Sequence, residues 1–200
     1  MSIIVNGTRA KNIVFNGKNV LYVKNKTSTN IYKRPGIEWT YIHSGMFRFA
    51  GGARYANGLW VACESNNSGL YWSEDGKTFK KSNITSGYFA GGARYANGLW
   101  VACGSVYSNN NSNGLYWSED GKTWTQSNIT SGGFAGGARY ANGLWVACGY
   151  GSGLYWSENG KTWTQSNITS GYFNGGARYA NGLWVACGDS GTDTFCSEEI

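Results

Sequence analysis

Two hundred residues with 41% hydrophobic and 16% aromatic content can bury a core, which excludes wholesale disorder. The 31 glycines and 10 tryptophans beside a single proline favour many short strands joined by tight turns. The net charge of +6 comes from residues 1–36, which hold seven basic and no acidic residues, while ten basic and eleven acidic residues make the remainder nearly neutral. No apolar run is long enough to span a membrane or to form a secretory signal, so we expect a soluble protein that is not exported.

The first 36 residues are expected to form a separate basic arm. Three short apolar runs, at 3–5, 13–15 and 20–23, are separated by Asn-Gly pairs, which predicts three short strands with tight turns. The segment Lys33–Gly36 contains the proline and ends the arm. Because three strands alone are marginally stable, we expect the arm to associate with copies of itself or to dock on another protein.

An internal repeat dominates residues 37–200. The string GGARYANGLWVAC begins at Gly51, Gly91, Gly136 and Gly175. A second string, GLYWSEDGKT followed by Phe or Trp, begins at Gly69 and Gly114 and recurs from Gly153 with Asn in place of Asp. A period of about 40 residues is typical of one β-propeller blade of four antiparallel strands. The sequence therefore predicts an all-β, four-bladed propeller with blades at 51–83, 90–128, 135–167 and 174–198.

Each repeat predicts two hairpins, and hence strands A to D in chain order. Asn-Gly, as at Asn57–Gly58, supplies the positive φ angles of a two-residue type I′ turn between ARYA and LWVAC. The second hairpin pairs GLYWSE with KTWTQSN across a Glu-Asp-Gly or Glu-Asn-Gly turn. Gly-Gly-Ala lies in strand A, where small residues let four sheets approach a narrow axis.

The last repeat ends within strand C, so its strand D must come from elsewhere. Trp39 lies 12 residues before Gly51, as Phe79, Trp124 and Trp163 lie 12 residues before the next three GGARYA strings. We therefore predict that a strand at 38–42 completes the fourth blade and closes the ring, which removes unpaired edges. In the alternative, several chains complete a larger ring by exchanging this strand.

The turn of the second hairpin resembles the Asp-box, Ser-x-Asp-x-Gly-x-Thr-Trp. The acidic side chain and the serine hydroxyl of this motif can form hydrogen bonds with the backbone of the turn, while the aromatic side chain packs inward. We expect this structural role for Ser73, Asp75, Ser118, Asp120, Ser157 and Asn159. Asp-boxes occur in sialidases, and that resemblance implies a turn element distant from the catalytic centre.

The sialidase resemblance does not extend to a catalytic site. Resemblance to sialidases would imply a six-bladed ring with an asymmetric arginine triad, whereas every arginine of the ring predicted here is a repeat copy. No nucleophile constellation or metal-ligand cluster accompanies the lone His43. We therefore expect no catalytic residue, no metal and no cofactor, and a glycosidase is the least favoured function.

Two repeated sets of side chains are candidate binding residues. Exposed tryptophans would suit the apolar faces of sugar rings; the strand C candidates are Trp72, Trp117 and Trp156. The arginines near the axis are expected to pair with equivalent glutamates or with carbonyl groups, and the alternative is an anion-binding channel. These arginines are Arg54, Arg94, Arg139 and Arg178, and the glutamates are Glu74, Glu119, Glu158 and Glu198.

The cysteines are expected to be mostly reduced core residues. Equivalent positions in different blades are too far apart to bridge; they are Cys63, Cys103, Cys148 and Cys187. Neighbouring strands of one blade would carry Cys187 and Cys196, so the sequence allows one disulfide, between these two residues.

The arm with its Val-Asn-Gly and Phe-Asn-Gly pairs, followed by YANGLWVACG and SxDGKTW repeats, resembles proteins of bacteriophages and gut-type bacteria. This resemblance implies a tail, baseplate or head-surface component of a virion, attached through residues 1–36, whose propeller displays a face for a ligand such as a cell-surface glycan. The expected partners are copies of the chain or other virion proteins; nucleic acid and membranes are not expected. The alternatives are a bacterial cytoplasmic location, a structural or decoration propeller without ligand, and a designed or recently amplified repeat.

Overall fold

The computed structural model describes residues 4–5, 8–9, 49, 51–64, 68–105, 113–189 and 193–197. The chain divides into two compact units, Met1–Ser44 and Gly45–Ile200. In the first unit β1 (Ile4–Val5) pairs antiparallel with β2 (Thr8–Arg9). The other strands predicted for the arm, the boundary at 36/37 and the strand at 38–42 lie outside the described residues.

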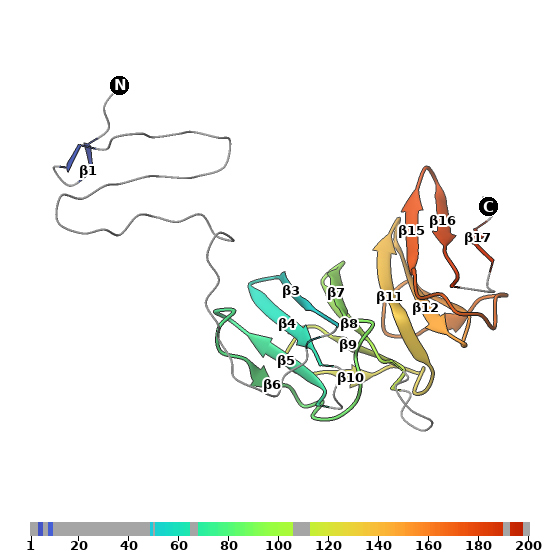
Figure 1. The fold of residues 1–200 in the computed structure, drawn as a ribbon, viewed down its shortest axis with the longest axis horizontal. Helices are drawn as coiled ribbons and strands as arrows, with labels where there is room; N and C mark the ends of the chain where they lie inside the picture. The colour runs from blue at the N-terminus through green and yellow to red at the C-terminus, as the bar shows by residue number, and fades with distance from the viewer. Residues whose placement is uncertain are drawn as a thin grey trace. The chain divides into compact units, whose positions relative to one another are not determined.

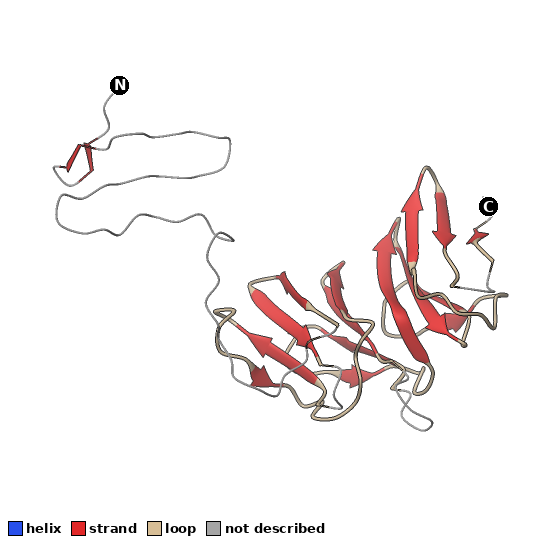
Figure 2. Ribbon diagram, viewed as in Figure 1, coloured by secondary structure: helices blue, strands red, loops and turns tan. Residues whose placement is uncertain are grey.

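Four antiparallel sheets, one for each repeat, make up the second unit (Figures 1 and 2). The first sheet contains β3 (Ala53–Ala56), β4 (Leu59–Cys63), β5 (Leu70–Ser73) and β6 (Lys80–Lys81), and the second contains β7 (Ala93–Ala96), β8 (Leu99–Cys103), β9 (Leu115–Ser118) and β10 (Thr125–Gln126). The third contains β11 (Gly133–Ala141), β12 (Leu144–Tyr150), β13 (Leu154–Ser157) and β14 (Thr164–Gln165). The fourth has three strands, β15 (Ala177–Ala180), β16 (Leu183–Ala186) and β17 (Phe195–Cys196).

The all-β prediction is confirmed, and so are both hairpins of the first three repeats and the first hairpin of the fourth. At the first hairpin turn Asn57 has φ 49° and Gly58 has φ 76°, and the three copies repeat these values within 8°. Both central residues therefore have the positive φ of a type I′ turn. In the described ranges no helix is long and apolar enough to cross a membrane.

In the first three sheets the strand register places the arginine, a valine and the strand C tryptophan in one row. In the second sheet Arg94 pairs with Val101, and Val101 also pairs with Trp117, whose other neighbour is Thr125. The same row recurs in the first and third sheets. Because side chains alternate between the two faces of a strand, the members of a row share one face of their sheet.

Each sheet packs one face against the opposite face of the next sheet. Leu59, Val61 and Cys63 of β4 form one core with residues of the second sheet, including Trp100 and Ala102. The equivalent residues of the second and third sheets form another core. Repeated sequence therefore gives repeated interfaces, as in other proteins built from stacked units.

Glycines let the first strands of neighbouring sheets approach at the backbone. A Cβ on Gly92 would lie 2.6 Å from the Gly51 carbonyl oxygen, and Gly137 and Gly176 make the equivalent approach to the preceding sheet at 2.7 Å. The Cβ of any other residue would clash at these positions. The fourth and first sheets make no such approach, since Gly52 has only Arg54 within 4 Å.

The cysteines are all free thiols. Cys63, Cys103 and Cys148 are buried, and burial raises the pKa of Cys103 to about 12, so these thiols stay neutral. The disulfide left open between Cys187 and Cys196 is absent, because the register places Cys196 opposite Val185.

Candidate functional site

The side chains predicted to stabilise the second hairpin turn bond its backbone. Asp120 Oδ1 accepts hydrogen bonds from the Ser118 hydroxyl at 3.0 Å and from the amides of Lys122 and Thr123, each at 2.7 Å. Ser118 Oγ in turn accepts from the Gly121 amide at 2.8 Å. The turn at Ser73 and Asp75 has the same bonds, and so does the turn at Ser157 and Asn159 with an amide oxygen as acceptor.

These bonds favour the ionised acid. Burial raises the pKa of Asp120, but the bonds from Thr123, Lys122 and Ser118 outweigh it and hold the pKa below its usual value. The Thr78 and Lys77 amides and the Ser73 hydroxyl likewise lower the pKa of Asp75. A carboxylate held in this way is a poor general acid or base near neutral pH.

Replacing Asp120 by Ala is expected to lower the free energy of unfolding by about 0.5 to 2 kcal/mol, the usual cost of losing a side-chain cap. Since the folded-state pKa is depressed, the carboxylate's contribution is present above the unfolded-state value near 3.8 and is lost as the pH falls below it. Urea melts between pH 2 and 7 measure both effects. Asp120→Asn is the matched control, which should keep most of the stability and lose the acid sensitivity of this site.

The strand C tryptophans named as candidate sugar platforms are differently placed. Lys122 Nζ lies 4.4 Å from the centre of the Trp72 ring and bonds Glu74 at 2.8 Å, and Lys161 does the same with Trp117 and Glu119. These lysines belong to the turn of the following sheet. The faces of Trp72 and Trp117 are therefore partly covered, whereas Trp156 is 38% exposed and no described lysine lies over it.

In the second and third sheets, the tryptophan that follows the second-hairpin turn fills the space to the preceding sheet. Trp124 is 3% exposed in the core between the first and second sheets, and Trp163 is 2% exposed in the core between the second and third. Each indole N–H donates to a carbonyl of its own turn, at Gly121 or Gly160, in a bond of 3.1 Å. The buried indole groups are thus both packed and hydrogen-bonded.

An asparagine at the end of the preceding sheet holds each of these tryptophan strands. Asn83 donates to the Trp124 carbonyl at 2.9 Å and accepts from the Trp124 amide at 2.8 Å. Asn128 makes both bonds to Trp163 at 2.8 Å. Sequence reasoning missed this link, because Asn-Ile-Thr at these positions has the form of a glycosylation sequon and nothing local shows a partner 35 or 41 residues away.

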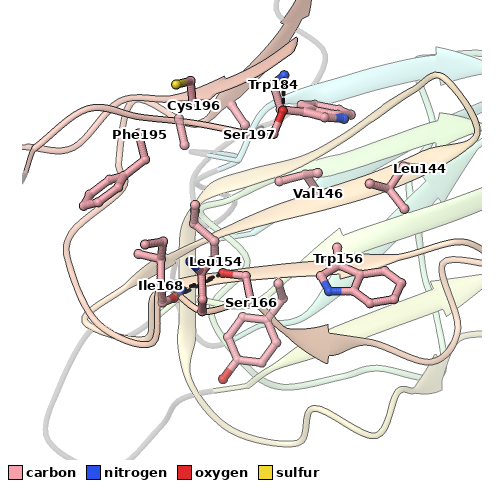
Figure 3. Close-up of a pocket in the computed structure, with 14 residues that line it drawn as sticks. Leu144, Val146, Leu154, Trp156, Ser166, Ile168, Trp184, Phe195, Cys196 and Ser197 are labelled. Carbon is pink, nitrogen blue, oxygen red and sulfur yellow. Dashed lines mark hydrogen bonds between the residues drawn. The ribbon is translucent and has the colours of Figure 1, made fainter. Parts of the chain in front are cut away.

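Between the third and fourth sheets a smaller buried core, which includes Cys148, Phe173 and Ala177, borders an open pocket of about 640 Å³ (Figure 3). Leu144, Val146, Leu154 and Ile168 line it from the third sheet, and the fourth sheet adds Trp184 and Phe195. Leu144, Leu154 and Trp184 are only half-buried, whereas their counterparts at the other two interfaces are at most 5% exposed. Among the described residues the fourth sheet has no fourth strand, and hence no tryptophan equivalent to Trp124 or Trp163.

The rim of the pocket carries the third copy of the asparagine. Asn167 corresponds to Asn83 and Asn128. Its side chain makes no hydrogen bond to any described residue. The pocket therefore combines an apolar cavity with the same donor and acceptor that bind a tryptophan backbone at the two complete interfaces.

The four repeated arginines do not pair with the repeated glutamates in the described residues. Glu74 and Glu119 bind lysines instead, so the expected pairing of the arginines with these glutamates is wrong. Arg54, Arg139 and Arg178 instead each donate to the carbonyl of the preceding alanine, at 3.2, 2.8 and 2.9 Å. Glu158 has no ion pair with a described residue, and Glu198 lies outside them.

No protein-family model and no curated protein matches the sequence. Among solved structures, the computationally designed Ika4 protein superimposes with a TM-score of 0.54 at 6% identity, covering 81% of this chain and 98% of that one. The computationally designed Ika8 protein gives a TM-score of 0.49 at 4% identity; 72% of this chain is covered, and it spans 44% of that protein's length. The chain thus shares its fold with Ika4 without detectable sequence similarity.

Proposed function

We propose that the chain is a non-enzymatic structural module, a four-bladed β-propeller amplified from one repeat and closed by the strand at 38–42. The observation that carries the proposal is the pocket between the third and fourth sheets, lined in part by Asn167, whose side chain makes no hydrogen bond to a described residue. Trp39 has the spacing of Trp124 and Trp163 relative to the following repeat. It is therefore the residue expected to fill this pocket, with its backbone bonded to Asn167.

The two outer faces of the row of sheets also support closure. The fourth sheet exposes Val185 (37%) and Cys187, whose counterparts Val61 and Cys63 are fully buried against the next sheet. The first sheet exposes Tyr55 (59%), whose counterpart Tyr95 is half-buried in the first interface. The open face of the fourth sheet thus matches the open face of the first, and packing one on the other would bury both.

A structural role fits the use that the repeated side chains already have. The turn acids bond turn amides, the strand C tryptophans of the first two sheets lie under lysines, and the asparagines hold neighbouring sheets together. Four identical copies of a 13-residue string favour recent amplification or design over adaptation of one site to a ligand. Glycan binding and attachment to a virion through residues 1–36 stay predictions.

Matched alanine substitutions at the asparagines test the proposal. Asn128→Ala removes two hydrogen bonds to Trp163 and is expected to lower the free energy of unfolding by about 1 to 2 kcal/mol. If Trp39 occupies the pocket, Asn167→Ala should cost as much, measured by urea melts of the full chain. If Asn167 is instead a surface residue without a partner, Asn167→Ala should change the free energy of unfolding by at most about 0.5 kcal/mol, and that result would refute the proposal.

A further inference from the structure

The arginines of the four repeats gather where the sheets approach most closely. Each arginine lies two residues after a Gly-Gly pair, and the glycine contacts bring the first strands of consecutive sheets together at the backbone. Burial, and then the charges of Arg139, Arg54 and Arg178, lower the pKa of Arg94 to about 10. The pKa of Arg139 is lowered most by burial and next by the positive charge of Arg178. Four like charges therefore share one small region.

No described group neutralises this charge. Glu74 and Glu119 are bound to lysines in the turns, and Glu158 makes no ion pair with a described residue. Cys63, Cys103 and Cys148 lie beside the arginines, but burial raises the pKa of each thiol, so none is an anion near neutral pH. In the part of the chain that the structure describes, the four arginines make no ion pair. Arg94 and Arg139 are half-buried, whereas Arg54 and Arg178 are exposed. Half-buried like charges are costly unless a counter-ion binds to them.

The guanidinium groups have donors to spare. A guanidinium carries five N–H donors, and Arg54, Arg139 and Arg178 each donate one hydrogen bond to a carbonyl of the same strand. Planar guanidinium groups bind oxyanions through two parallel N–H bonds. Arginines on consecutive strands that approach at the backbone thus offer donors that match the several acceptor oxygens and the double charge of a tetrahedral anion.

We propose that Arg54, Arg94, Arg139 and Arg178 form a binding site for one small tetrahedral oxyanion of the phosphate class. The site goes beyond the structural role proposed above, because it gives the axis of the sheets a ligand. It rests in part on the closure proposed above, because Arg178 belongs to the three-stranded fourth sheet, whereas Arg94 and Arg139, whose substitution tests the site, belong to four-stranded sheets. Anion binding stabilises the folded chain by neutralising the mutual repulsion of the arginines.

Calorimetry and thermal melts of the full chain with inorganic phosphate, at constant ionic strength in chloride, test the site. We expect saturable binding by the wild type, with a rise in melting temperature, and at least tenfold weaker binding by Arg94→Gln and by Arg139→Gln. Lys77→Gln removes the same charge from an exposed turn and should bind like the wild type. Without phosphate, relief of repulsion should leave both arginine variants at least as stable as the wild type, so loss of binding is separable from unfolding.

Three outcomes would overturn the site. One is a phosphate effect that does not saturate, which indicates non-specific screening alone. Another is binding that Arg94→Gln and Arg139→Gln leave unchanged. The third is an equal loss in Lys77→Gln, which would show that net charge, and not the arginine cluster, controls binding.

Discussion

Replacing Trp39 by Ala is expected to lower the free energy of unfolding by about 3 to 5 kcal/mol, the usual cost of deleting a buried tryptophan side chain. The reason is the pocket of about 640 Å³ between the third and fourth sheets, which lacks the tryptophan present at the other two interfaces. Guanidinium or urea melts of the full chain measure the change. Deleting residues 1–45 should have a larger effect than Trp39→Ala, because it exposes the edge of β17. Aggregation or loss of cooperative melting is expected.

Trp163→Ala is the matched control for this prediction. Trp163 is 2% exposed between the second and third sheets, so its removal should cost about as much as the removal of Trp39. If Trp163→Ala is strongly destabilising while Trp39→Ala is neutral, the pocket is not filled by Trp39. A truncated chain, residues 46–200, that stays monomeric with unchanged thermal stability would contradict closure by the strand at 38–42.

Gly136→Ala should be among the most damaging single changes in the chain. A Cβ at this position would lie 2.0 Å from the Phe173 carbonyl oxygen and 2.7 Å from Cys148 Cβ, and neither backbone nor buried core can move aside easily. We expect a loss of about 3 kcal/mol or more in the free energy of unfolding, at the upper end of overpacking effects. Thermal melts and expression in soluble form measure the change.

Gly175→Ala probes the same contact at the junction of the fourth and first sheets. With the sheets as described, its Cβ meets nothing nearer than Cys187 at 3.2 Å, so the change would be mild. By the repeat, ring closure would bring the Phe49 carbonyl against Gly175, as Phe173 lies against Gly136. We therefore expect Gly175→Ala to approach Gly136→Ala in cost. A mild effect would show that these two sheets do not meet.

The hairpins could be predicted from sequence because their determinants are local. Asn57–Gly58 and its copies require positive φ, and the Ser118 and Asp120 side chains bond backbone within three residues. The period of the repeat then assigned one sheet to each copy, which the structure shows. These inferences needed no knowledge of how one sheet lies on the next.

The contacts between sheets could not be predicted in the same way. Lys122 covers Trp72 and Asn83 holds Trp124 only because one sheet is rotated against the next, and the sequence separations reach 48 residues. For the same reason the glutamates were assigned to arginines when lysines of the following sheet lie closer. The proposal that Asn167 bonds the backbone of Trp39 rests on what its two copies, Asn83 and Asn128, do in the structure.

A disulfide between position 40 and Cys196 tests most directly whether the strand at 38–42 completes the fourth sheet. In the second and third sheets the residue after the turn tryptophan pairs with the strand C aromatic, as Thr125 does with Trp117, so Thr40 should lie opposite Cys196. In a Cys187→Ser background, Thr40→Cys should form an intramolecular disulfide with Cys196, detected by peptide mass spectrometry on a monomeric chain, because paired strands bring Cα atoms within disulfide range. Tyr41→Cys, on the opposite face, should not. Disulfide-linked dimers, or no disulfide at all, would contradict closure of the four sheets within one chain.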